Sequence, residues 1–226
     1  RSYEPPLLLE LTSFGSNVGF IELEAQDTWQ FEVGTRGATR NLSWDIALFE
    51  WDVEDEIINL NVQPFPGAPF TIPSYRNAES TRHLGLELGV GIRFGNFEWR
   101  NAYTWSDFTF DGDSDFGDND LPGAPDSVLY SELRYEHDSG FWIAPNLDAS
   151  LSSYYVDSAN TTRNSAFEVF GLKAGFPIGP VHLVIDASNL TDEDYSASVQ
   201  VDSAIDRYYE PANGRSVSLG LRWRRD

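Results

Sequence analysis

The sequence contains no cysteine, no methionine and only one lysine, Lys173. The lack of cysteine excludes disulfide frameworks and thiolate metal sites. Because methionine is also missing, the sequence does not open on a start codon, and we expect a processed product or a fragment. No apolar run approaches the roughly 20 residues that a membrane-spanning helix needs, and no signal-peptide pattern is present. A helical membrane protein is therefore not expected.

The charge of the chain is strongly one-sided. Its 226 residues include 36 acidic and 15 basic side chains, which gives a formal charge of −21. This acidity opposes binding to polyanions, so nucleic acid is not expected as a partner. The three histidines, His83, His137 and His182, are far apart and lack ligand-spaced partners, and no nucleophile motif or phosphate-binding glycine loop is present. We therefore expect no enzyme, no bound metal and no cofactor.

Apolar residues recur at every second position in many segments, which is the period of a β-strand. The clearest segment is 83–94, where six apolar residues alternate with polar or small ones: Leu84, Leu86, Leu88, Val90, Ile92 and Phe94. The same alternation is found in residues 29–36, 42–48, 97–106, 129–136, 141–152 and 217–224, and with more exceptions in 166–176 and 181–187. Together with the N-terminal stretch, this pattern predicts about ten strands.

Short and long connections alternate between these strands. The short ones are residues 37–41, 95–96, 138–140 and 177–180, and the long polar ones are 12–27, 63–74, 111–126, 156–164 and 201–213. In an up-and-down meander this order puts every tight turn at one end of the sheet, as in outer-membrane barrels. Strands of about ten residues can also cross a bilayer when tilted. The predicted fold is therefore all-β, an antiparallel up-and-down transmembrane β-barrel.

Aromatic residues near the predicted strand ends fit the girdles that such barrels place at the membrane interfaces. The expected girdle residues are Trp99, Tyr103, Trp105, Tyr135, Phe141, Trp142, Tyr154 and Tyr155. Two other architectures remain open at this stage. One is a soluble or surface-anchored β-sandwich that binds carbohydrate, and the other is a small, self-closed, porin-like channel of ten strands.

Two C-terminal motifs resemble a known family. The first is Asn189-Leu190-Thr191-Asp192-Glu193-Asp194-Tyr195, and the second opens with Gly214-Arg215-Ser216 and runs to Trp223. With further matches in residues 1–10, 32–36, 85–87, 119–125 and 157–161, the ordered set resembles the TonB-dependent receptors of the outer membrane over essentially the whole chain. Members of that family usually end on an aromatic residue, whereas this chain continues past Trp223 with Arg-Arg-Asp.

The resemblance implies a bacterial outer-membrane receptor with an N-terminal plug inside a barrel of about 22 strands. Residues 1–226 would then be the C-terminal portion of the barrel, without the plug. The implied partners are TonB, ExbB and ExbD acting through the plug, the barrel-assembly machinery, and outer-membrane lipids. The implied ligand is a scarce nutrient: a ferric siderophore is the first choice, and vitamin B12, a saccharide or another chelate are alternatives.

Seven charged residues are expected on the inward faces of neighbouring strands: Glu87, Arg93, Glu98, Arg100, Glu132, Arg134 and Glu136. Opposite charges on adjacent strands attract, so we predict a lattice of ion pairs facing the lumen. This lattice would contact the plug or line a permeation path, and simple stabilisation of the wall is an equal alternative. The acidic loop with Asp111, Asp113, Asp115, Asp118 and Asp120 invites a calcium site, but Phe116 stands where an EF-hand needs glycine, which favours a solvated loop.

Overall fold

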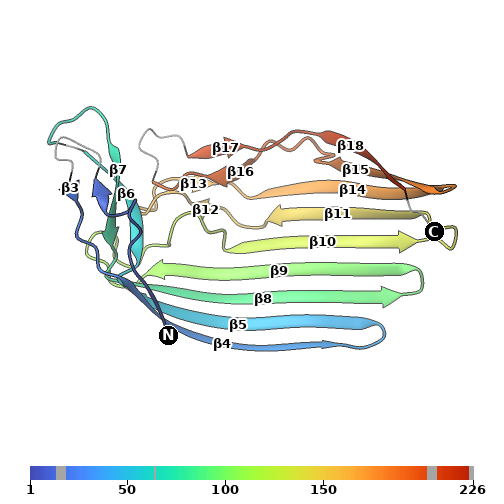
Figure 1. Cartoon of the computed structure of the whole chain (residues 1–226), viewed down its shortest axis with the longest axis horizontal. Helices are drawn as coiled ribbons and strands as arrows, with labels where there is room; N and C mark the ends of the chain where they lie inside the picture. The colour runs from blue at the N-terminus through green and yellow to red at the C-terminus, as the bar shows by residue number, and fades with distance from the viewer. Residues whose placement is uncertain (14–18, 64, 203–207, 224–226) are drawn as a thin grey trace.

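A computed structural model describes residues 1–13, 19–63, 65–202 and 208–223 (Figure 1). Ten strands form one antiparallel sheet, and each strand pairs with the sheet strand that comes next along the chain. They are β1 (Ser2–Glu4), β4 (Gln26–Ala38), β5 (Leu42–Glu54), β8 (Ser80–Phe94), β9 (Phe97–Phe110), β10 (Ser127–Glu136), β11 (Trp142–Ser150), β14 (Phe167–Ile178), β15 (Val181–Ser188) and β18 (Ser216–Trp223). The predicted ten-stranded meander is confirmed. Within the described ranges, no helix is long and apolar enough to cross a membrane.

The tight turns and the long connections lie at opposite ends of this sheet. Figure 1 shows the turns after β4, β8, β10 and β14 at the right, here called the turn end, and the long connections at the left, here called the loop end. Four small hairpins belong to the long connections: β2 (Thr12–Ser13) with β3 (Gly19–Phe20), β6 (Ile57–Val62) with β7 (Ile72–Asn77), β12 (Tyr154–Tyr155) with β13 (Arg163–Asn164), and β16 (Ser196–Val199) with β17 (Tyr209–Pro211). The predicted alternation of short and long connections is confirmed, although residues 203–207 of the last long one lie outside the described residues.

The register of the strands gives the sheet one apolar and one polar face over its turn-end half. Leu48 pairs with Val33 and Leu86, Leu88 pairs with Tyr103, and Leu221 pairs with Leu183. Directly paired residues point to the same side of a sheet, so these side chains share one surface, the apolar face. Glu87, Arg93 and Glu98 alternate with them and lie on the opposite, polar face.

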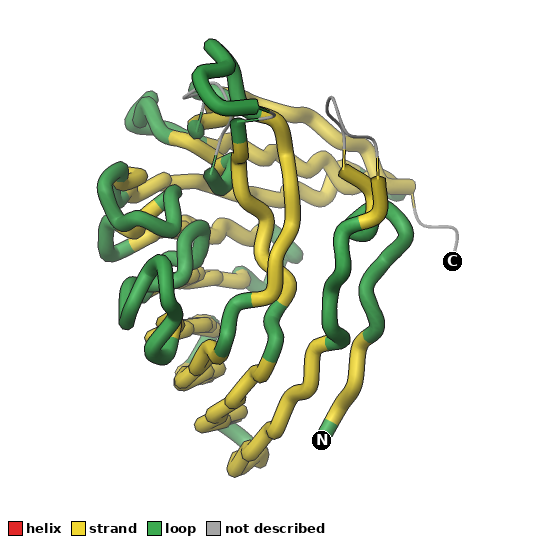
Figure 2. Tube along the Cα trace, turned by 90° about the vertical axis from the view of Figure 1, so that its left-hand side faces the viewer, coloured by secondary structure: helices red, strands yellow, loops and turns green. Residues whose placement is uncertain are grey.

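No second layer covers the apolar face in the described part of the chain. Val217, Leu219 and Leu221 are 64%, 70% and 76% exposed, and Phe31 is 68% exposed. A β-sandwich buries these residues against a facing sheet, so the sandwich alternative is wrong. Figure 2 shows the strands as an open arc, and β1 and β18 are its unpaired edges. The chain therefore forms part of a barrel wall and does not close on itself, which also contradicts the small self-closed channel.

The alternation reverses its phase towards the loop end. On β5 the apolar positions change sides after Leu48: Phe49, Trp51 and Val53 point to the polar face, while Glu50 and Asp52 point to the apolar face. Arg82 on β8 makes an ion pair with Glu50 on that same side. The apolar face is therefore a band that ends in charged side chains at its loop-end margin. The alternation in residues 42–48 does not predict this inversion, because it begins only after Leu48.

Candidate functional site

The seven charged residues predicted for the lattice all lie on the polar face of β8, β9 and β10. The carboxylate of Glu98 forms ion pairs with two arginines, Arg93 at 3.0 Å and Arg100 at 2.8 Å. Arg134 lies 3.3 Å from Glu136 on the same strand. Glu132 pairs at 3.3 Å with Lys173 of β14, a partner that we did not predict. The structure thus brings these residues together as separate small groups, and Glu87 makes no ion pair with any described residue.

At the loop end, three long connections and the β6–β7 hairpin are tied to one another. The side chains of Asn119 and Asn160 reach from one connection to the next, donating 2.9 Å hydrogen bonds to the carbonyls of Ser158 and Asp120. Ser158 in turn donates from its backbone N–H and its hydroxyl to Asp202, at 2.9 and 2.7 Å. We call the described residues of this assembly, 57–77, 111–126, 151–166 and 189–202, the loop platform.

An ion pair between Arg76 and Asp113 joins the β6–β7 hairpin to the rest of the loop platform. The two guanidinium nitrogens of Arg76 lie 2.9 and 2.6 Å from the two carboxylate oxygens of Asp113, a bidentate geometry. The backbone N–H groups of Asp115 and Phe116 also donate to Asp113. Burial raises the pKa of Asp113, but these donors outweigh it and lower the pKa to about 2. Asp113 is only 3% exposed, so the expectation of a solvated acidic loop is wrong for this residue.

The low pKa of Asp113 predicts that acid loosens the loop platform. Its pKa in the folded protein, about 2, lies below the ordinary value of 3.8, so the carboxylate stabilises the fold fully above pH 3.8. That contribution, about 2 kcal/mol, is lost as the pH falls from 3.8 through 2. Pepsin cleavage of residues 111–126 should therefore rise steeply across this range. In an Asp113→Asn variant the same segment should be cleaved at every pH, with a much shallower pH dependence.

A cluster of aromatic rings lies on the polar face of the sheet, next to the loop platform. Phe49, Trp51, His83 and Phe108 pack their rings at centroid distances between 4.7 and 6.4 Å. His83 Nε2 lies 3.1 Å from Glu56, which also accepts a hydrogen bond from Thr81. Burial raises the pKa of Glu56, but the hydrogen bonds from His83 and Thr81 outweigh it, and the net shift is downward.

Two residues of this cluster, His83 and Phe108, line a hollow of about 210 Å³, whose other walls come mainly from the loop platform. Its lining combines apolar side chains such as Phe110 and Leu121 with the polar groups of Glu56, His83 and Asp202. Such a mixture suits a small ligand with an apolar body and a few hydrogen-bonding groups. Across the described residues, no three His, Asp or Glu side chains are grouped so that they could hold a metal ion.

Gly85 makes room for the ring of Phe49, so we expect Gly85→Ala to disturb this cluster. A Cβ at Gly85 would lie 2.2 Å from Phe49 Cζ, and the ring is already held between Trp51 and Phe108. We expect a loss of about 1–3 kcal/mol, the usual cost of overpacking. Urea unfolding of the protein in lipid vesicles measures it. Gly89→Ala is the control on the same strand and face, because its new Cβ would meet only Asp45, at 3.6 Å.

The two halves of the C-terminal motif meet at the loop end of β15 and β18. The side chain of Asn189, 1% exposed, donates to the carbonyls of Glu193 and Asn213. Asp192 accepts a 3.0 Å hydrogen bond from the backbone N–H of Arg215. A Cβ at Gly214 would lie 3.4 Å from Asp192 Oδ1, so this approach is close. Hydrogen bonds between the motif residues thus hold the start of the last long connection next to its end.

The remaining motif residues differ in their surroundings. The ring of Tyr195 lies 4.5 Å from that of Phe167, and the backbone N–H of Leu190 donates to Phe170. Thr191 is exposed, and Trp223 is 66% exposed at the turn end of β18. The Tyr195 ring and the Leu190 backbone thus connect the motif to the neighbouring strand β14.

Three of the aromatic residues expected in interfacial girdles lie elsewhere: Trp142 on the polar face, and Tyr154 and Tyr155 in the β12–β13 hairpin of the loop platform. Trp142 pairs with Glu136 and Gly175, which places it on the polar face. Tyr154 is 8% exposed in the β12–β13 hairpin, where its hydroxyl accepts a hydrogen bond from Asn164. Trp99 and Tyr103 lie on the apolar face, as a girdle requires.

Comparison with known proteins agrees with this architecture. The family model described as "TonB dependent receptor-like, beta-barrel" matches residues 1–202. Among solved structures, the copper transporter OprC is similar with a TM-score of 0.77 and 18% identity, over 96% of this chain and 34% of that one. The siderophore receptor PiuA from Acinetobacter baumannii gives 0.73 and 18%, over 89% and 29%, and the ferric yersiniabactin uptake receptor FyuA from Yersinia pestis gives 0.70 and 19%, over 94% and 32%.

The chain thus spans about a third of the length of these solved structures. At such low identities the structural likeness supports the fold alone, whereas the family model covers most of the sequence. Its match ends at residue 202, before Gly214, Arg215 and Trp223. The chain belongs to the TonB-dependent receptor β-barrel family, and it is a protein of the bacterial outer membrane.

Proposed function

We propose that residues 1–226 are the C-terminal portion of the barrel wall of a TonB-dependent receptor, with a plug domain supplied by a preceding part of the protein. The apolar face would meet lipid, because an uncovered band of leucine, valine and tryptophan side chains is stable only in a bilayer. The polar face, including the seven charged residues on β8, β9 and β10, would then line the lumen. The turn end would face the periplasm and the loop platform would lie outside the cell.

The function that this arrangement supports best is energy-coupled uptake of a scarce nutrient. The long strands of the wall are hydrogen-bonded to their neighbours along most of their length, so we assign opening of the path to the plug. Energy would reach the plug from the inner membrane through TonB, ExbB and ExbD. The ligand would change the population of plug states by binding them with different affinity.

A ferric siderophore is the substrate that we propose first. The hollow of about 210 Å³ beneath the loop platform combines aromatic walls with histidine and carboxyl groups, which suits part of a chelate with an apolar body. The single observation that carries the uptake proposal is the match to the receptor family over residues 1–202. Of the three similar solved structures named above, PiuA is described as a siderophore receptor and FyuA as a ferric yersiniabactin uptake receptor.

A copper ion or copper chelate is the second candidate. The copper transporter OprC is similar in fold, and the formal charge of −21 would attract cations to the acidic loops. Measurements of iron and copper uptake are therefore needed to decide which metal the receptor prefers.

Uptake by cells that contain or lack the gene tests this proposal. We expect the intact receptor to import 55Fe-labelled siderophore in iron-starved cells, and deletion of TonB should abolish the import. Copper accumulation is measured in the same strains under copper limitation. Import of copper without iron would replace the siderophore by the second candidate, and import that persists without TonB would contradict energy coupling.

A further inference from the structure

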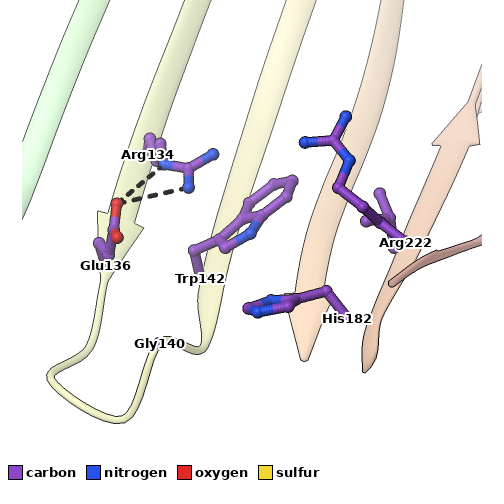
Figure 3. Close-up of a pocket in the computed structure, with 7 residues that line it drawn as sticks. Arg134, Glu136, Gly140, Trp142, His182 and Arg222 are labelled. Atoms are coloured by element: carbon purple, nitrogen blue, oxygen red, sulfur yellow. Dashed lines mark hydrogen bonds and ion pairs between the residues drawn. The ribbon is translucent and has the colours of Figure 1, made fainter. Parts of the chain in front are cut away.

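A hollow of about 480 Å³ opens on the polar face at the turn end of the last strands. Arg134, Trp142, His182 and Arg222 line it, and they come from β10, β11, β15 and β18. Figure 3 shows their side chains projecting around one space, with Glu136 beside Arg134 at its edge. No function assigned above uses this hollow.

The floor of the hollow is the indole of Trp142, which has room to lie there because residue 175 is a glycine. A Cβ at Gly175 would lie 2.1 Å from the indole Nε1 of Trp142, so the indole lies against the backbone of β14. The guanidinium of Arg134 lies 4.0 Å from the centroid of the Trp142 ring, which is a cation–π contact. Gly175 and Arg134 therefore hold the indole in place before any ligand arrives.

The polar groups around this floor are mostly donors without acceptors. Among the described residues, nothing accepts a hydrogen bond from the indole N–H of Trp142 or pairs with the guanidinium of Arg222. Glu136 is the one carboxylate of the lining, and it is engaged by Arg134 at 3.3 Å. In a chain with a charge of −21, the two arginines beside one paired carboxylate make this site locally basic.

We propose that this hollow binds a carboxylate group. Arg222 and the indole N–H of Trp142 donate to the two carboxylate oxygens, and His182 adds a third polar contact. The rest of the ligand lies beside the indole, against Val184. One guanidinium beside a neutral N–H matches a single negative charge better than the double charge of a phosphate.

Two sources offer this chemistry to a surface that lines a lumen. One is a small carboxylate in solution, and the other is an aspartate or glutamate side chain of a polypeptide segment inside the barrel. The second source rests on the proposed function, and the first does not. Both make the same contacts with Arg222 and Trp142. The test therefore asks whether the hollow is empty, and so can bind an added carboxylate, or is already filled by a carboxylate of the protein.

The first arm of the test measures binding of benzoate to the intact receptor in detergent. The protein is labelled with 5-fluorotryptophan, and Trp142→Phe identifies the fluorine resonance of residue 142. Benzoate should shift that resonance saturably, whereas the neutral analogue benzamide should not. Arg222→Gln should weaken the binding by about tenfold, the usual effect of losing one charge-assisted hydrogen bond. Arg36→Gln is the matched control, because Arg36 is exposed at the turn end of the same face and pairs with Asp45 at 3.5 Å.

The second arm of the test applies if a carboxylate of the protein already fills the hollow. Benzoate then gives no shift, but Arg222→Gln by itself moves the resonance of Trp142 while Arg36→Gln leaves it in place. A photoreactive p-benzoylphenylalanine at Val184 should cross-link to a peptide that contains aspartate or glutamate. Equal shifts with benzoate and benzamide, or equal effects of the two arginine variants, would overturn the proposal. Neither arm measures transport, so a failed uptake assay and a failed binding assay are told apart.

Discussion

Replacing Leu88 by arginine is expected to destabilise the barrel by about 2–4 kcal/mol and to reduce its assembly in the outer membrane. Leu88 lies midway along the apolar face of β8 and pairs with Ile46 on one side and Tyr103 on the other. On our assignment of this face to lipid, the new guanidinium would lie near the middle of the bilayer. No acidic side chain is available there, since the nearest charged residues of that face lie at its loop-end margin.

Urea unfolding in lipid vesicles and heat-modifiable migration on gels measure the effect of Leu88→Arg. Glu87→Arg is the matched control, because it introduces the same side chain one residue away, on the polar face. Glu87 makes no ion pair with a described residue, so we expect a change within about 1 kcal/mol there. Equal losses for the two variants would contradict the assignment of the apolar face to lipid.

The strands and their order could be predicted because their signal is local. In β8 the alternation from Leu84 to Phe94 is unbroken, and a period of two residues fixes which side each residue takes. Tight turns such as Gly95-Asn96 then fix the direction of the next strand. The polar-face positions of Glu87, Arg93 and Glu98 follow from the same period. Fold class and face were therefore readable from short stretches of sequence.

The parts that were missed depend on pairs that are distant in sequence. Nothing near Arg76 shows that its partner is Asp113, 37 residues further on, in another long connection. The packing of the Trp142 indole against β14 depends on the absence of a side chain at Gly175 of that strand. The inversion after Leu48 was visible in the sequence as Phe49, Trp51 and Val53 alternating with acids. It marks where the sheet leaves the apolar band.

Removing the carboxylate of Asp113 is expected to loosen the loop platform by about 3 kcal/mol, at the lower end of the cost of breaking a buried ion pair. The side chain of Asp113 is fully buried, whereas that of Arg76 keeps 23% exposure, so water offsets part of the loss for the arginine. Asp113→Ala also leaves the amides of Asp115 and Phe116 without their acceptor. The hairpin β6–β7 would then be held to residues 111–126 mainly by weaker contacts, such as that of Arg76 over the Phe116 ring.

Hydrogen exchange of the amides of Asp115 and Phe116 measures this loosening, because both donate to Asp113 in the intact protein. A loss of about 3 kcal/mol corresponds to exchange that is faster by about 100-fold. Asp115→Ala is the control: its carboxylate lies 3.4 Å from the same arginine but is 65% exposed, so its removal should cost less than about 1 kcal/mol. If both variants exchanged at the same rate, the bidentate pair would not be what joins the hairpin to the platform. In that case the cohesion of the outer loops would have to come from the asparagine contacts of Asn119 and Asn160, which neither substitution touches.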